Sequence, residues 1–146
     1  MRAVDFLQTF VDLTLCYGIK SPDTELYDFG FSEAFRGTNL CDNKSCTHIL
    51  HALCRFKVIW RNGESRVDKY YEDTPYKKFC SEVKCLLGRK VRRITLSGKN
   101  DLWIDFGDFW IVFVTFEDGE ESWRLFTTND ELPHLVASNS WLDFSK

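Results

Sequence analysis

The chain has 146 residues, of which 44% are hydrophobic and 16% aromatic, and its formal net charge is −3 at pH 7. This length predicts one globular domain, residues 1–146, with a core that needs no disulfide bonds. The sequence has no apolar run of 18 residues, which argues against a membrane-spanning helix, and acidic residues interrupt its apolar N-terminus, which argues against a secretory signal. We therefore expect a cytoplasmic protein whose six cysteines are reduced.

The N-terminal half is predicted to hold a helix and then two strands. Polar residues at i, i+3, i+4 and i+7 from Asp5 make one face of an amphipathic helix over residues 3–17. Residues 25–31 are consistent with a short strand. From residue 48 to residue 61 every second position is apolar, which predicts one long strand. The apolar face of that strand comprises Leu50, Ala52, Cys54, Phe56, Val58 and Trp60.

Two glycine-containing pairs predict hairpin turns. Asn62-Gly63 suits a two-residue turn that places Lys57 opposite Asp68 and Arg61 opposite Glu64. Asp118-Gly119 suits a second turn, in which Val112 pairs with Leu125 and Val114 with Trp123.

The remaining elements are a second helix and several short strands. Thr74-Pro75 is typical of a helix N-terminus, and Gly88 is typical of a helix end. Strands are expected over residues 91–96, 101–106, 109–116 and 120–127, followed by a small hairpin around Asn139. The fold class is therefore α+β, a mainly antiparallel sheet of about six to nine strands with two amphipathic helices packed on it.

Charge is distributed unevenly along the chain. Residues 56–100 carry 12 basic and 5 acidic side chains, whereas residues 101–146 carry 2 and 10. Two interpretations stay open. The acidic segment binds a partner with a basic surface, or the two segments neutralise each other within the fold. Nucleic acid is not the expected partner, because the chain is acidic overall and its basic segment lacks interleaved aromatic residues.

The acidic segment also supplies the candidate site residues. Strand periodicity places Asp101, Trp103 and Asp105 on one face, with Asp108 nearby, an arrangement that suits a sugar or a cation in a small-molecule-binding protein or hydrolase. No catalytic constellation completes it, so catalysis is not the favoured interpretation. The candidate binding residues are Trp103, Asp105, Asp108, Glu117, Glu120 and Glu121.

A cluster of cysteines and histidines raises a third alternative, a zinc-binding domain. Cys41, Cys46 and His48 are the most plausible ligands of a cluster that extends to Cys54. The cluster lacks the C-x2-C spacing of a zinc knuckle, and in a strand His48 and His51 point to opposite faces. No metal and no cofactor are therefore expected.

The run from Glu117 to Phe126 and the segment Pro133-His134-Leu135-Val136 resemble the closing hairpin of small bacterial proteins of the immunity-protein type. The resemblance covers the last third of the chain and brings no functional residues with it. It implies a small cytosolic α+β domain without catalysis. The leading hypothesis is a non-catalytic protein-binding module that neutralises a basic toxin partner through an acidic surface.

Overall fold

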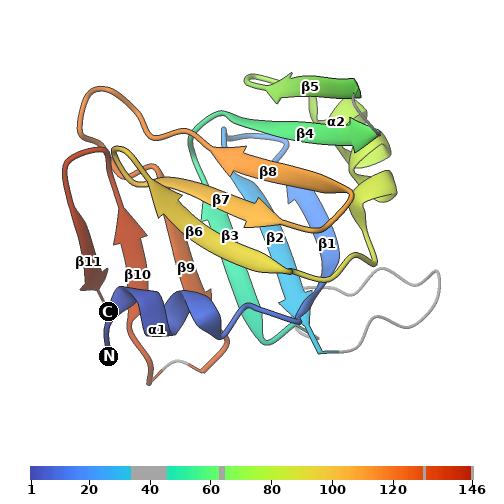
Figure 1. Cartoon of the computed structure of the whole chain (residues 1–146). Coiled ribbons are helices and arrows are strands. Elements are labelled where there is room, and N and C mark those ends of the chain that lie inside the picture. The colour runs from blue at the N-terminus through green and yellow to red at the C-terminus, as the bar shows by residue number, and fades with distance from the viewer. Residues whose placement is uncertain (34–45, 63–64, 130, 146) are drawn as a thin grey trace.

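The computed structural model describes residues 1–33, 46–62, 65–129 and 131–145. Within these residues the chain forms eleven strands in two antiparallel sheets (Figure 1). The six-stranded sheet has the order β1 (Thr14–Lys20), β2 (Tyr27–Ser32), β3 (His48–Ala52), β9 (Trp123–Thr127), β10 (His134–Ala137) and β11 (Leu142–Ser145). The five-stranded sheet has the order β5 (Ser65–Tyr71), β4 (Phe56–Asn62), β8 (Phe109–Phe113), β7 (Asp101–Asp105) and β6 (Arg93–Ser97).

The two sheets pack face to face, and their strands cross at a steep angle (Figure 1). Between them lies one apolar core rich in aromatic rings. Phe56 lies at its centre, with ring centroids 5.2 Å from Phe113 and 5.6 Å from Phe29. Trp123 is fully buried in the core, where its indole N–H donates to the carbonyl of Asn100 at 2.9 Å.

The predicted strand over residues 48–61 is two strands in different sheets. β3 ends at Ala52 and β4 begins at Phe56. Between them the backbone N–H groups of Leu53 and Cys54 both donate to the carbonyl of Ser122. The chain therefore turns a corner there and passes from one sheet to the other.

The two predicted hairpins have different outcomes. β4 pairs with β5 as expected, but Asn62 pairs with Ser65 and Ile59 with Asp68, so the ladder is shifted by two residues from the predicted register. The turn itself lies outside the described residues. The predicted pairing of Val112 with Leu125 is wrong, because β8 and β9 belong to different sheets. A hairpin is nevertheless present at the C-terminus, where β10 pairs with β11.

The helices are shorter than predicted. α1 spans Ala3–Gln8 only, and residue Asp12 with φ of 72° precedes β1. α2 (Tyr76–Glu82) continues as the 3-10 helix η1 (Val83–Leu86). The antiparallel class is confirmed, but two amphipathic helices packed on a sheet are not, since these short helices lie at the margins of the sandwich (Figure 1). None of the described helices is long and apolar enough to cross a membrane.

Candidate functional site

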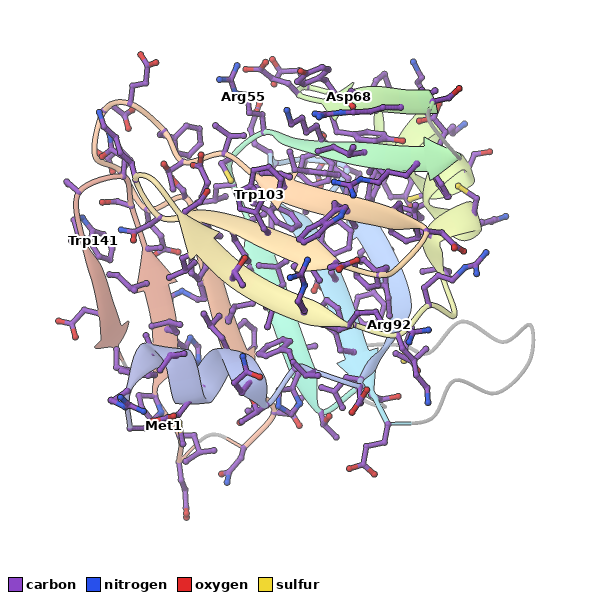
Figure 2. All side chains as sticks on the ribbon, in the orientation of Figure 1. Met1, Arg55, Asp68, Arg92, Trp103 and Trp141 are labelled. Atoms are coloured by element: carbon purple, nitrogen blue, oxygen red, sulfur yellow. The ribbon has the colours of Figure 1, made fainter. Side chains whose placement is uncertain are left out.

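The outer face of the five-stranded sheet carries the predicted tryptophan. Leu102 and Ile104 are buried in the core, so the alternation of β7 turns Trp103 outward, as Figure 2 shows. Trp110 on β8 meets Trp103 edge to face, with centroids 5.9 Å apart. The guanidinium of Arg93 lies 5.2 Å from the ring centroid of Trp110, and that of Arg61 lies 5.9 Å from it. We call Trp103, Trp110, Arg61 and Arg93 the aromatic patch.

The carboxylates predicted beside Trp103 have partners within the chain. Asp105 accepts from the backbone N–H of Gly107 at 2.8 Å, and its other oxygen lies 3.4 Å from Arg93. Asp108 directly precedes β8, at the end of this strand that is farther from the corner between β3 and β4. Its carboxylate pairs with Arg89 at 2.8 Å. Both arginines belong to the basic segment 56–100. The two segments therefore neutralise each other in part within one chain.

The acidic β8–β9 loop contains three of the predicted binding residues, one in an ion pair and two exposed. Glu121 makes an ion pair with Arg124 at 2.8 Å. Glu117 and Glu120 are exposed, and the N–H of Glu120 donates to Asp118 in the turn. Glu117 and Asp118 line a hollow of about 390 Å³ together with Arg55, Glu72, Val114, Thr115 and Phe116.

A second hollow adjoins this one, and together they gather five carboxylates at one end of the sandwich. It measures about 120 Å³ and shares Arg55, Glu72 and Phe116 with the first. Its lining adds Glu25 from the β1–β2 loop and Asp73 from the β5–α2 loop. We call this region, where β4 begins and β5 and β8 end, the acidic end; its carboxylates are Glu25, Glu72, Asp73, Glu117 and Asp118.

The carboxylates of the acidic end repel one another. A hydrogen bond between the carboxyl groups of Glu25 and Asp73 raises the pKa of Glu25, and the negative charges of Asp73 and Glu72 raise it further, whereas the positive charge of Lys20 lowers it. Arg55 is the one cation that lines the two hollows, yet within the described residues it forms no ion pair. Figure 2 places Arg55 at the edge of the sandwich, near the start of β4. Among the described residues, the five carboxylates of the acidic end thus outnumber Arg55 and Lys20, the cations identified beside them.

Sequence reasoning found only part of the acidic end. Glu117 was predicted, but Glu25, Glu72 and Asp73 were not, because only the topology brings their loops beside the β8–β9 loop. Cys54 lies in the wall of the smaller hollow. Burial raises its pKa to about 12, so this thiol stays protonated at neutral pH and is a poor nucleophile.

The proposed zinc ligands are not brought together as far as the structure describes them. Cys41 lies outside the described residues. Cys46 is buried against Ile49 on the outer face of the six-stranded sheet. The two ring nitrogens of His48 lie 2.9 Å from the hydroxyl of Thr47 and 3.2 Å from that of Thr9. Among the described residues no group of three or more His, Cys, Asp and Glu side chains could hold a metal ion.

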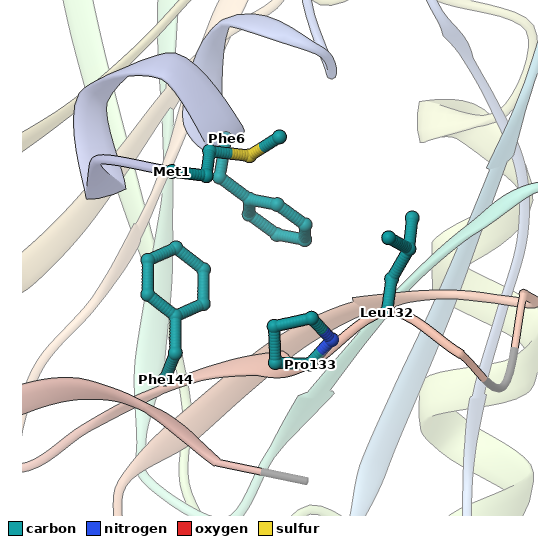
Figure 3. Close-up of a pocket in the computed structure, with 5 residues that line it drawn as sticks. All are labelled: Met1, Phe6, Leu132, Pro133 and Phe144. Atoms are coloured by element: carbon teal, nitrogen blue, oxygen red, sulfur yellow. The ribbon is translucent and has the colours of Figure 1, made fainter.

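A third hollow is apolar and lies between α1 and the β10–β11 hairpin (Figure 3). It measures about 260 Å³ and is lined by Met1, Phe6, Leu132, Pro133 and Phe144. Phe6 and Phe144 meet edge to face across it, with centroids 5.8 Å apart. Its lining carries no charged side chain.

Comparison of the chain with protein-family models, with curated proteins and with solved structures finds no match. The resemblance of the last third of the chain to immunity proteins therefore stays a prediction. Function must be inferred from the geometry of the chain itself.

Proposed function

We propose that the chain is a non-catalytic protein-binding module whose acidic end binds a partner with a basic surface. The observation that supports this proposal best is the convergence of five carboxylates from three loops around two adjoining hollows. Segments this far apart in sequence meet there only because of the fold.

The energetics of the free protein favour this interpretation. Like charges held close together destabilise a fold, and after the hydrogen bond with Asp73 the negative charges of Asp73 and Glu72 contribute to the raised pKa of Glu25. A lysine or arginine side chain of the partner at the two hollows would relieve the repulsion and, among the described residues, displace no ion pair. Electrostatic complementarity of this kind accelerates association and selects the partner.

The aromatic patch supplies a second contact area beside the acidic end. Val114 lines the larger hollow, and Trp103 pairs with Val112, two residues before Val114. Tryptophan is enriched among the residues that dominate binding energy at protein interfaces. The partner is therefore expected to place basic side chains in the hollows and an apolar group against Trp103.

Neutralisation of a basic, nuclease-like toxin is one function that such a module would serve, as the resemblance to immunity proteins implies. A small-molecule site or hydrolase around residues 101–108 has less support. Asp105 is engaged by Gly107 and Arg93, while Asp108 pairs with Arg89 at the far end of β8. Neither carboxylate is left to act on a substrate beside Trp103.

Binding of a fluorescein-labelled decalysine peptide, measured by fluorescence anisotropy, tests the proposal. The variant E25Q/D73N/E117Q removes three negative charges from the acidic end. The control D5N/E131Q/D143N removes three exposed negative charges elsewhere and changes the net charge equally. We expect the first variant to bind at least tenfold more weakly than wild type and the control to bind within twofold of it. Equal losses in the two variants would mean that only net charge matters and would contradict the proposal.

A further inference from the structure

The outer face of the six-stranded sheet carries a polar site that is separate from the acidic end. A hollow of about 240 Å³ opens there, between side chains of β1, β2, β3 and β9. Ile49 and Phe126 form its apolar walls, and three polar groups converge on one side. The lining comprises Tyr17, Asp28, Ile49, His51, Phe126 and Thr128.

Asp28 is the focus of the polar groups. The hydroxyl of Tyr17 donates to its Oδ1 atom at 3.0 Å, and Nε2 of His51 lies 3.4 Å from the same oxygen. The side chain of Asp28 is only 15% exposed. Among the described residues no lysine or arginine lies within ion-pair distance of it. A largely buried carboxylate without a permanent cation favours a positively charged ligand, because burial makes an uncompensated charge costly.

The backbone holds Tyr17 in this position. Gly30 pairs with Tyr17 across β1 and β2, and a Cβ atom at Gly30 would lie 2.0 Å from a ring carbon of Tyr17. The aromatic ring therefore lies over the glycine and carries its hydroxyl to Asp28, two residues before Gly30 on the same face of β2. Any larger residue at position 30 would displace the ring.

The opposite wall of the hollow is equally well defined. The ring of His51 meets Phe126 edge to face at 4.9 Å, and His134 stacks on Phe126 at 4.4 Å. Arg124 lies 2.9 Å from Nδ1 of His134, and Glu121 balances its charge. Arg124 therefore does not neutralise Asp28, and Phe126 is fixed between two imidazole rings.

We propose that this hollow binds a small organic ammonium ion, with the ammonium group on Asp28 and an apolar body against Ile49 and Phe126. An engineered cavity of about 150 Å³ holds one benzene ring, so the hollow has room for a ring with a short aminoalkyl arm. A metal ion is a poorer match, because the described residues present no set of three ligands. An anion would be repelled by Asp28.

A charge series of ligands tests the site without depending on any variant. Benzylamine, benzyl alcohol and benzoate have similar shapes and carry positive, zero and negative charge at pH 7.5. We expect benzylamine to shift the amide signals of Asp28, His51 and Phe126 in two-dimensional NMR, with a dissociation constant of about 1 mM. Benzyl alcohol should bind at least tenfold more weakly, and benzoate should not bind.

Two aspartate variants then locate the charge. D28N should weaken benzylamine binding at least tenfold. D143N should leave it unchanged, since Asp143 is an exposed carboxylate on β11 of the same sheet. Benzyl alcohol binding as tightly as benzylamine would overturn the proposal. So would equal effects of D28N and D143N, or an absence of shifts at these amides up to 20 mM benzylamine.

Discussion

Replacement of Gly30 by alanine tests the packing that positions Tyr17. The new Cβ atom would lie 2.0 Å from Cε1 of Tyr17 and 2.7 Å from Sγ of Cys46, both in side chains that are at most 4% exposed. Overpacking of this kind costs about 1–3 kcal/mol. If the ring moves away, loss of the charge-assisted hydrogen bond from Tyr17 to Asp28 adds about 1.5–3 kcal/mol. We expect G30A to lower the free energy of unfolding by about 1–3 kcal/mol if the ring stays in place, and by about 2.5–6 kcal/mol if the hydrogen bond is also lost.

Urea denaturation monitored by circular dichroism measures this free energy, and thermal unfolding should show a decrease in Tm of roughly 3–4 °C per kcal/mol. G98A is the matched control. Gly98 has no atom within 4 Å of its Cβ position, so this substitution costs only the strain of a φ of 52°, about 1 kcal/mol. The double variant G30A/Y17L should be less destabilised than the sum of its single variants by about 1 kcal/mol or more.

Two results would refute this reasoning. One is a G30A protein within about 0.5 kcal/mol of wild type, which would mean that the ring does not lie over β2. The other is strict additivity of G30A and Y17L, which would mean that the cost arises elsewhere than at the tyrosine ring.

Three further predictions concern the acidic end, the N-terminal region and the core. E25Q should raise Tm at pH 7. The raised pKa of Glu25 means that the folded state loses stability as the pH rises above 4.5, the ordinary pKa of a glutamate. The gain in Tm should therefore disappear at a pH below 4.5. E131Q, at an exposed carboxylate elsewhere, should show no such gain. Burial lowers the pKa of His48, so the free energy of unfolding should fall as the pH drops below 6.5. In H48Q the free energy of unfolding should change less with pH between 7 and 5 than in wild type. W123F removes buried volume and the hydrogen bond to Asn100, so denaturation should show a loss of about 2–4 kcal/mol, whereas W141F, at an exposed tryptophan, should change stability by less than about 0.5 kcal/mol.

Hydrophobic periodicity predicted most of the strands, but it missed β1, gave fewer than the eleven described strands, and could not reveal that they form two sheets. The apolar positions from Leu50 to Trp60 alternate without interruption, although the chain turns a corner between them. Both sheets face the same core, so inward residues keep their period of two through the bend. A single long strand and a strand that changes sheets thus have the same pattern.

Local turn signals failed for a related reason. Asp118-Gly119 has the composition of a hairpin turn, but the nine residues between Phe113 and Trp123 carry the chain from one sheet to the other. Leu125 pairs instead with Leu50 on β3, which is distant in sequence, and with Leu135 on β10, the next strand along the chain. The predicted helix over residues 3–17 is too long, because β1 begins at Thr14. Residues at the start of β1 are buried on both faces, so they lack the alternation by which a strand is recognised.

The candidate site was predictable only where one strand contains it. Alternation along β7 placed Trp103 and Asp105 on the outer face correctly. The acidic end combines loops that contain Glu25, Asp73 and Glu117, and no local pattern connects them. The ion-pair partner of Asp105 could not be predicted either, because its pairing with Arg93 depends on the register between β6 and β7.

The most direct test of the proposed function is quantitative affinity purification from a lysate of the source cell. Wild type, E25Q/D73N/E117Q and the charge-matched control D5N/E131Q/D143N would be used as baits, with bound proteins measured by mass spectrometry. We predict that wild type and control enrich the same basic protein and that the variant of the acidic end loses it. Retention of that protein by E25Q/D73N/E117Q, or enrichment of a partner without a basic surface, would contradict the assignment of the acidic end as the binding site.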